Sequence, residues 1–149
     1  FPDRWVLHRV LIENIHAADA TLFAHDGLLW LSAATGDHGA TDRDAMSLYH
    51  AEHLEGPWTP HPLNPVVVDV HGARPAGWIV KANDGLRRPA QDCSAGYGSG
   101  LSVRRIDRLT REDYAETELA RIAPPALWKA TGFHTVNWAA GIEAIDAVR

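Results

Sequence analysis

The segment Arg88-Pro89-Ala90-Gln91-Asp92-Cys93-Ser94 brings a guanidinium, an amide and a carboxylate close together in the chain. In a strand, alternate side chains point to opposite faces, so Arg88 and Asp92 would share one face and Gln91 would take the other. Asp92 has the chemistry of a general acid or base, and its alternative role is a buried carboxylate that accepts structural hydrogen bonds. Cys93 is expected to be a small buried apolar residue rather than a nucleophile.

Two other side chains have the chemistry of ligand recognition. Arg74 offers a rigid fork of donors that suits a carboxylate, a phosphate or a vicinal diol. Its structural alternative is an ion pair with Asp19 or Asp92. His134 can donate to a ligand oxygen or hold a carboxylate, and its alternative is a purely structural histidine.

The most acidic stretch, residues 36–44, contains three Asp and a His. Its spacing does not fit an EF-hand because no Glu follows at the twelfth position. We therefore expect a solvated loop between strands and no metal site. Residues 96–100 contain G-x-G but no helix is expected after them, so no dinucleotide cofactor is predicted.

Length and composition limit the class of protein. The chain has 149 residues and a net charge of −5, with 46% apolar and 22% charged residues, which predicts one compact domain. Its basic residues are scattered, so nucleic acid is excluded as a partner, and no apolar run could span a bilayer. A single cysteine excludes a disulfide framework and a Cys-rich zinc site. No signal peptide is visible, so a cytoplasmic location fits while the compartment stays open.

The regular segments required to position these residues are strands. A hairpin is predicted across Asp26-Gly27, because a type I′ turn needs positive φ at both central positions. Asp84-Gly85 marks a second hairpin, and the prolines of residues 55–65 exclude a helix there. Thr110 is expected to cap one helical turn over residues 110–114. Apolar and β-branched runs predict extended segments at residues 5–12, 21–23, 28–33, 45–51, 66–70, 78–81, 86–89, 101–106, 116–122, 132–137 and 141–145.

The second half of the chain repeats the plan of the first. The two Asp-Gly pairs lie 58 positions apart, and a repeat of roughly this length with a hairpin in each unit is typical of β-propeller blades. About two blades and part of a third would fit in the chain, whereas propellers close with about 4–8 blades. Unpaired strand edges invite association. Since the chain also lacks a starting Met, we expect it to be the C-terminal part of a larger propeller or to assemble with itself.

Particular residues carry a family resemblance. Asp19-Ala20-Thr21-Leu22-Phe23, followed by His25-Asp26-Gly27-Leu28-Leu29-Trp30-Leu31, resembles the blade motif D-x-T-L-F-x-x-D-G-x-x-W-L. That motif recurs in five-bladed propeller glycosidases such as the family 43 and family 32 glycoside hydrolases. Residues 54–65 are similar to the turn between blades in those enzymes.

A more specific resemblance is to one branch of that superfamily. Residues 73–77 and 88–94 resemble the propeller domain found N-terminal in plant glucosamine inositolphosphorylceramide transferases and in bacterial relatives. Tyr97-Gly98, Leu109-Thr110, Tyr114 and residues 132–137 continue the match over nearly the whole chain. The resemblance implies an all-β fold: a partial five-bladed β-propeller with about two and a half blades of four-stranded antiparallel sheet, in one domain over residues 1–149.

The resemblance also implies roles for residues. Family 43 enzymes take their acidic residues from the innermost strands of different blades, and Asp19 lies where such a strand would begin. Asp19 is thus expected in the central cavity, with a backbone-capping turn residue as the alternative. Hydrolysis needs two carboxyl groups, which would be Asp19 and Asp92. The substrate-binding residues would be Arg74, Arg88, Gln91 and His134, and an anionic sugar or sugar phosphate would suit Arg74.

Three functions remain in view. The leading hypothesis is a glycoside hydrolase-like module that acts on or binds a glycan in the central cavity, without a cofactor. Two blades that normally precede residue 1 in this branch carry an Asp-Pro and a Pro-Glu motif, and both motifs are absent. The alternative is therefore a non-catalytic glycan-binding or scaffolding domain of a glycosyltransferase-type or other sugar-modifying enzyme, and a third reading is a self-assembly module. The expected partners are a glycan or sugar-containing small molecule and further blades, with no nucleic acid and no membrane insertion.

Overall fold

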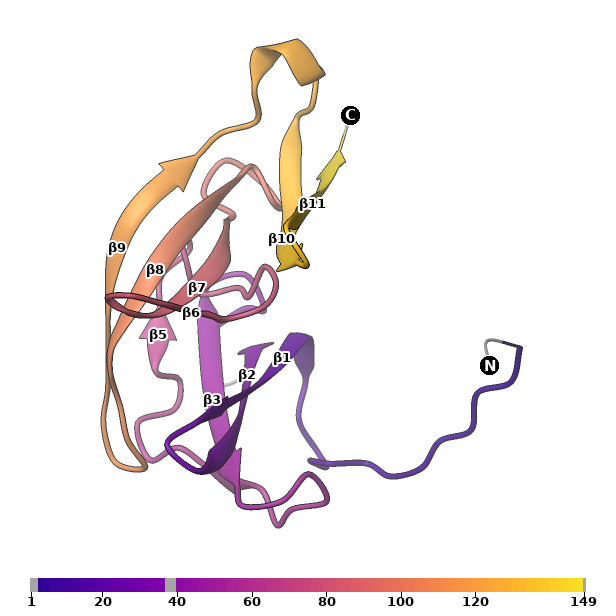
Figure 1. Cartoon of the computed structure of the whole chain (residues 1–149), viewed down its shortest axis with the longest axis vertical. Coiled ribbons are helices and arrows are strands. Elements are labelled where there is room, and N and C mark those ends of the chain that lie inside the picture. The colour runs from indigo at the N-terminus through magenta and orange to yellow at the C-terminus, as the bar shows by residue number, and fades with distance from the viewer. Residues whose placement is uncertain (1–2, 37–39, 149) are drawn as a thin grey trace.

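The structure is a computed structural model that describes residues 3–36 and 40–148. In these residues the regular elements are β-strands and one short 3-10 helix, so the predicted all-β class is confirmed. The strands form three antiparallel sheets (Figure 1). Their bounds are β1 (Ala17–His25), β2 (Leu28–Thr35), β3 (Ala45–Ala51), β4 (Thr59–Pro60), β5 (Val67–Val68), β6 (Val80–Ala82), β7 (Gly85–Asp92), β8 (Gly100–Leu109), β9 (Tyr114–Ile122), β10 (Gly132–Ala139) and β11 (Ile142–Val148), and the 3-10 helix η1 covers Ala126–Trp128.

The first sheet has the order β1-β2-β3-β4, and β5 also pairs with β3. β4 and β5 are two residues each, because the prolines of this stretch cannot donate to a ladder. The side chain of Asn64 fills the interval between them. Its Nδ2 donates to the Leu48 carbonyl and its Oδ1 accepts from the Leu48 N–H, both at 2.8 Å. An amide side chain thus replaces a strand backbone at this edge.

The second sheet has the order β6-β7-β8-β9, and β10 and β11 form a separate hairpin. Each of the two larger sheets therefore follows chain order. The predicted type I′ turn is confirmed, since Asp26 has φ 47° and Gly27 has φ 77°. In the second hairpin Ala82 pairs with Gly85, so Asn83 and Asp84 form the turn.

The sheets are held together by apolar cores between their faces. Side chains of β2 and β3 meet side chains of β8 and β9 in the largest core, which contains Trp30, Met46, Leu48, Ile106, Leu109 and Tyr114. A smaller core joins Leu101 of β8 to Phe133 and Val136 of β10. Figure 1 shows the resulting succession along the long axis, from β1–β3 at the bottom through β6–β9 to β10–β11 at the top.

Two expectations differ from the structure. Residues 110–113 form a turn between β8 and β9 and Tyr114 is the first residue of β9, so the expected helical turn is absent. Thr110 does accept the N–H groups of Glu112 and Asp113, but its own N–H donates to the Asp113 carbonyl, which closes the turn. The apolar residues 5–12 belong to no strand, and Figure 1 shows the N-terminal segment running away from the sheets. Ile12 and Ile15 of this segment pack against Leu31, Ala33 and Tyr49 of the first sheet.

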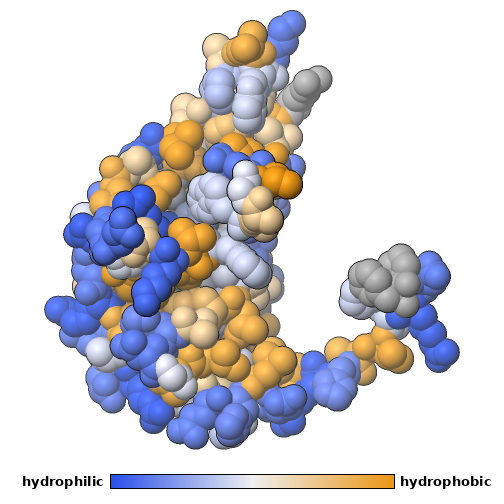
Figure 2. Space-filling model, in the orientation of Figure 1, coloured by the Kyte–Doolittle hydropathy of each residue, from blue (hydrophilic) through white to orange (hydrophobic). Residues whose placement is uncertain are grey.

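Figure 2 shows that the outline of the molecule is hollowed between the N-terminal segment and the β10–β11 hairpin. Within the part of the chain that the structure describes, no helix has the length and apolar character needed to cross a membrane.

Candidate functional site

A β-bulge positions Asp19 on β1. The pairing of β1 with β2 shifts register between Ala18 and Thr21, and Asp19 has φ 52°, in the left-handed region that Asp tolerates. A bulge of this kind turns a side chain out of the regular alternation of its strand. The local backbone therefore directs the Asp19 carboxylate toward the segment that carries Arg74.

Arg74 is the centre of the cluster that results. Its Nε donates to Asp19 Oδ2 at 2.6 Å, and its Nη1 donates to the carbonyl and to Oδ2 of Asp42, both at 2.9 Å. Its Nη2 donates to the Tyr97 hydroxyl at 3.3 Å, and the guanidinium lies 4.8 Å from the centre of that ring. Burial alone would lower the pKa of Arg74, but its hydrogen bonds to Asp42 and Asp19 outweigh burial and raise that pKa.

Gln91 and His134 join the same cluster. The fully buried amide of Gln91 donates from Nε2 to Asp19 Oδ2 at 3.0 Å, while its Oε1 is buried and has no hydrogen-bond partner among the described residues. His134 hydrogen-bonds the Tyr97 hydroxyl through Nε2, and its Nδ1 lies 3.3 Å from Asp146 Oδ2. The structure thus brings together Asp19, Arg74, Gln91 and His134, four of the six predicted site residues.

Asp19 lines a cavity of about 440 Å³, together with Ala20, Thr21, Leu22, Pro75, Gly77, Trp78 and Thr135. In the described residues both side-chain hydrogen bonds of Asp19 end on Oδ2, and Oδ1 accepts none. One oxygen of the carboxylate is therefore anchored by two donors and the other stays available to a donor in the cavity. A carboxylate held in this way is a fixed acceptor for hydroxyl or N–H groups.

Arg88 lies elsewhere, in a buried ion pair. Its Nη2 donates to Glu116 Oε1 at 2.7 Å and to the Gly72 carbonyl at 2.7 Å, and its side chain is only 1% exposed. Burial would lower the pKa of Arg88, but Glu116 and Tyr114 raise it above its ordinary value. Alternation along β7 explains the separation, because Arg88 and Gln91 point to opposite faces.

Asp92 also has its own partners. Its carboxylate lies 3.2 Å from His71 Nδ1 and accepts the Ser94 N–H at 2.9 Å. Burial would raise the pKa of Asp92, but the Ser94 hydroxyl and N–H, together with His71, lower it below its ordinary value. None of the contacts of Asp92 reaches the Asp19 cluster in the residues that the structure covers.

Three members of these sites were missed by sequence reasoning. Tyr97 lies in residues 96–100, whose G-x-G was considered only as a dinucleotide motif and whose Tyr97 was given no role, and His71 stands alone in the sequence. Asp42 belongs to the acidic segment interpreted as a solvated loop, of which residues 37–39 lie outside the described part. Their short loops carry no periodicity, so only their contacts reveal them. Cys93 is free and buried, as expected, and the described residues contain no group of three metal-ligating side chains.

Comparison with known proteins identifies the family. Residues 1–129 match the family described as "Glucosamine inositolphosphorylceramide transferase 1, N-terminal". Glucosamine inositolphosphorylceramide transferase 1 of Oryza sativa subsp. japonica is 35% identical over 119 residues, which are 78% of this chain and 16% of the rice protein. The protein of the same name from Arabidopsis thaliana is 32% identical over 124 residues, which are 80% of this chain and 16% of that protein. No solved structure matches. The chain therefore belongs to the N-terminal domain family of glucosamine inositolphosphorylceramide transferase 1.

Proposed function

We propose that the chain is a non-catalytic glycan-binding domain that serves a sugar-transferring enzyme. The observation that carries this proposal is that Asp19 lines a cavity while its carboxylate is anchored through Oδ2 by Arg74 and Gln91. Fixed carboxylate acceptors suit the hydroxyl groups of a sugar, since a ligand site gains specificity from a few placed polar groups. The name of the relatives, glucosamine inositolphosphorylceramide transferase, contains a sugar and an inositol-containing lipid.

The charges of the cluster favour an uncharged glycan. Arg74 donates hydrogen bonds to Asp19, Asp42 and Tyr97, so it has few donors left for an incoming anion. Two carboxylates around one guanidinium would also repel a sugar phosphate. The role that we assign to Arg74 is to hold Asp19 in place, rather than to bind an anionic sugar as its residue type alone suggested.

Hydrolysis of a glycan is a less well supported function for this chain than binding. A glycosidase needs a pair of carboxyl groups that face one another across the substrate bond. Asp92, the second acidic candidate, contacts His71 and Ser94 instead of the cavity that Asp19 lines. The family comparison points the same way, because the named relatives are transferases.

For the architecture, we propose that the sheets are blades of a five-bladed propeller and that the chain is one domain, the C-terminal part of that propeller. The meander order of the two larger sheets and the apolar cores between successive sheets support it. In such an arrangement β1 and residues 74–82 would line the central cavity, together with β10. A crystal structure of the chain with its natural flanking sequence tests this directly, and a sandwich or closed barrel would refute it.

The experiment for the function is a titration of the chain with monosaccharides, namely glucose, galactose, mannose, glucosamine and inositol, followed by protein-observed NMR. We expect at least one of them to bind and to shift the signals of Asp19 and Thr135. The Asp19→Asn variant should bind it about tenfold more weakly, because a hydrogen bond to a charged group contributes about 1.5–3 kcal/mol.

The control is Asp84→Asn, which removes an exposed carboxylate that pairs with Arg87 and does not line the Asp19 cavity, and which should leave binding unchanged. Binding that is indifferent to Asp19→Asn contradicts the proposed site. Turnover of aryl glycosides by the chain, lost in Asp19→Asn, contradicts the non-catalytic assignment and supports hydrolysis.

A further inference from the structure

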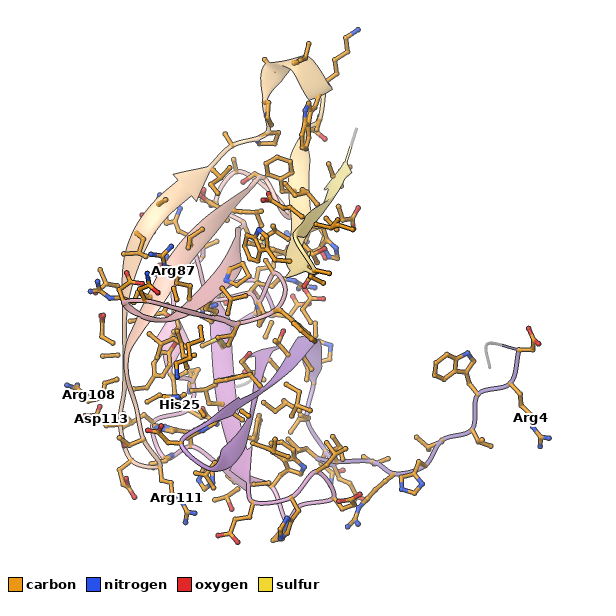
Figure 3. The ribbon with its side chains drawn as sticks, in the orientation of Figure 1. Arg4, His25, Arg87, Arg108, Arg111 and Asp113 are labelled. Carbon is orange, nitrogen blue, oxygen red and sulfur yellow. The ribbon has the colours of Figure 1, made fainter. Side chains whose placement is uncertain are left out.

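Two neighbouring cavities are lined by residues of β1. The cavity that Asp19 lines shares Leu22 and Trp78 with a second one of about 430 Å³. The second cavity continues along β1 and is also lined by Phe23, Ala24, His25, Asp26, Ile79, Lys81, Gly85 and Leu86. His25, which is labelled in Figure 3, is the last residue of β1. From Asp19 to His25 the strand rises by about 20 Å, which is longer than one sugar ring. We call these two neighbouring cavities, which share Leu22 and Trp78 in their lining, the β1 trough.

Trp78 lines both cavities. Its backbone is fixed, because its N–H donates to Asn137 Oδ1 at 3.0 Å and the preceding Gly77 has φ 130°. A Cβ at Gly77 would lie 2.1 Å from the Val136 carbonyl oxygen, so the segment approaches β10 as closely as a glycine permits. The residue itself is nevertheless 64% exposed. The fold thus holds the backbone of a large aromatic residue rigidly while leaving its ring uncovered.

The apolar and polar groups of the β1 trough are distributed in a way that complements a carbohydrate. Apolar residues, chiefly Trp78 and Leu22, lie in the middle, and polar groups lie at both ends, with Asp19 at one end and His25, Asp26 and Lys81 at the other. A pyranose has the same division, with C–H groups on its faces and hydroxyl groups at its edge. The negative face of an indole attracts such C–H groups. A rigid Trp also loses little conformational entropy on binding, since it has only two side-chain torsions.

We propose that Trp78 is the stacking platform of a second sugar subsite, and that the ligand is an uncharged oligosaccharide of at least two pyranose rings lying along β1. One ring occupies the Asp19 cavity and the next covers Trp78. The proposal rests on the glycan-binding function proposed above, and adds the minimum length of the ligand and the residue that contacts its second ring.

The test is calorimetric titration of the 149-residue chain with two sets of probes. One set is glucose, galactose, mannose and N-acetylglucosamine, and the other is the β1,4- and α1,4-linked di- to tetrasaccharides of the same sugars. We expect at least one oligosaccharide to bind about tenfold more tightly than its monosaccharide, as covering about 60 Å² of apolar ring surface implies. Trp78→Ala should remove this gain, so that the oligosaccharide binds that variant no more tightly than its monosaccharide does, and Trp78→Phe should retain part of the gain.

The matched control is Trp138→Ala. Trp138 is another partly exposed tryptophan, on β10, and it lines neither of the two cavities. Circular dichroism melts should show that both alanine variants are folded, since neither ring is buried.

The outcomes separate the two proposals. Oligosaccharides that bind no more tightly than monosaccharides, or an unchanged gain in Trp78→Ala, overturn the Trp78 subsite while Asp19-dependent monosaccharide binding still supports the proposed function. Absence of binding by every sugar overturns both. A dimer in light scattering that Trp78→Ala dissociates would assign the β1 trough to a second copy of the chain, and would also overturn the subsite.

Discussion

Removing the charge of Glu116 should destabilise the protein severely. Its carboxylate accepts three hydrogen bonds from Arg88, with Nε at 3.0 Å and Nη2 at 2.7 and 2.9 Å, and Arg104 lies 3.6 Å away. The side chains of Arg88 and Glu116 are 1% and 7% exposed. Glu116→Gln keeps the volume but turns an NH₂ group toward one donor and leaves the Arg88 charge unpaired between β7 and β9.

The expected cost follows from burial. Breaking a buried ion pair from one side costs about 3–5 kcal/mol, because the remaining charge cannot be hydrated. This is a large part of the stability of a domain, which is about 5–15 kcal/mol. We therefore expect the midpoint of urea unfolding, followed by circular dichroism, to fall sharply in Glu116→Gln. The slope of the unfolding free energy against urea concentration should stay the same.

The adjacent residue on β7 provides a control. Arg87 pairs with Asp84 on the opposite, solvent-facing side, where their side chains are 43% and 41% exposed, and Asp84→Asn should leave the midpoint within experimental error. The double variant Arg88→Met with Glu116→Met should recover stability relative to Glu116→Gln, since it leaves no buried charge alone. Equal midpoints for Glu116→Gln and the unmodified chain would refute this account of Arg88 as a structural residue.

Three other results are expected. Gly77→Ala should destabilise the chain by about 2 kcal/mol or more in thermal melts, because its Cβ would strike the Val136 carbonyl; the control Gly141→Ala, which has positive φ but open space, should cost less. The free energy of unfolding should fall on acidification. Burial first, and then Arg111 and His61, lower the pKa of His50, so the folded state favours the neutral ring and its contribution to stability declines below about pH 6.5. Asp92, whose pKa is also lowered, makes a second contribution to stability, which is present above its pKa in the unfolded chain and is lost as the pH falls through its pKa in the folded chain. Urea midpoints that rise as the pH is lowered would contradict both expectations. Tryptophan fluorescence and circular dichroism should report one coincident unfolding transition, because the cores join successive sheets, and separate transitions would contradict the single domain.

Local structure was largely predictable from the sequence. Ala45–Ala51 was predicted as a strand with the bounds that β3 has, and the Asp26-Gly27 turn has the positive φ values that its residue types indicate. These features depend on near neighbours: β-branched and apolar runs favour extended backbone, and Asp-Gly tolerates the left-handed region. The helical turn over residues 110–114 failed for the same local reason, since the signals that cap a helix also close a turn between strands.

The partners of the polar residues were decided by the tertiary structure. The sequence by itself established an all-β chain, a polar segment in β7 and an arginine at position 74, and it left open whether Arg74 pairs with Asp19 or with Asp92. A bulge in β1 and the stacking of the sheets bring Asp19, Asp42 and Gln91 to one place, although they are far apart in the chain. Strand patterns determine which face a side chain takes, whereas the neighbour it meets depends on how the sheets pack, and that packing is set by contacts between residues distant in sequence.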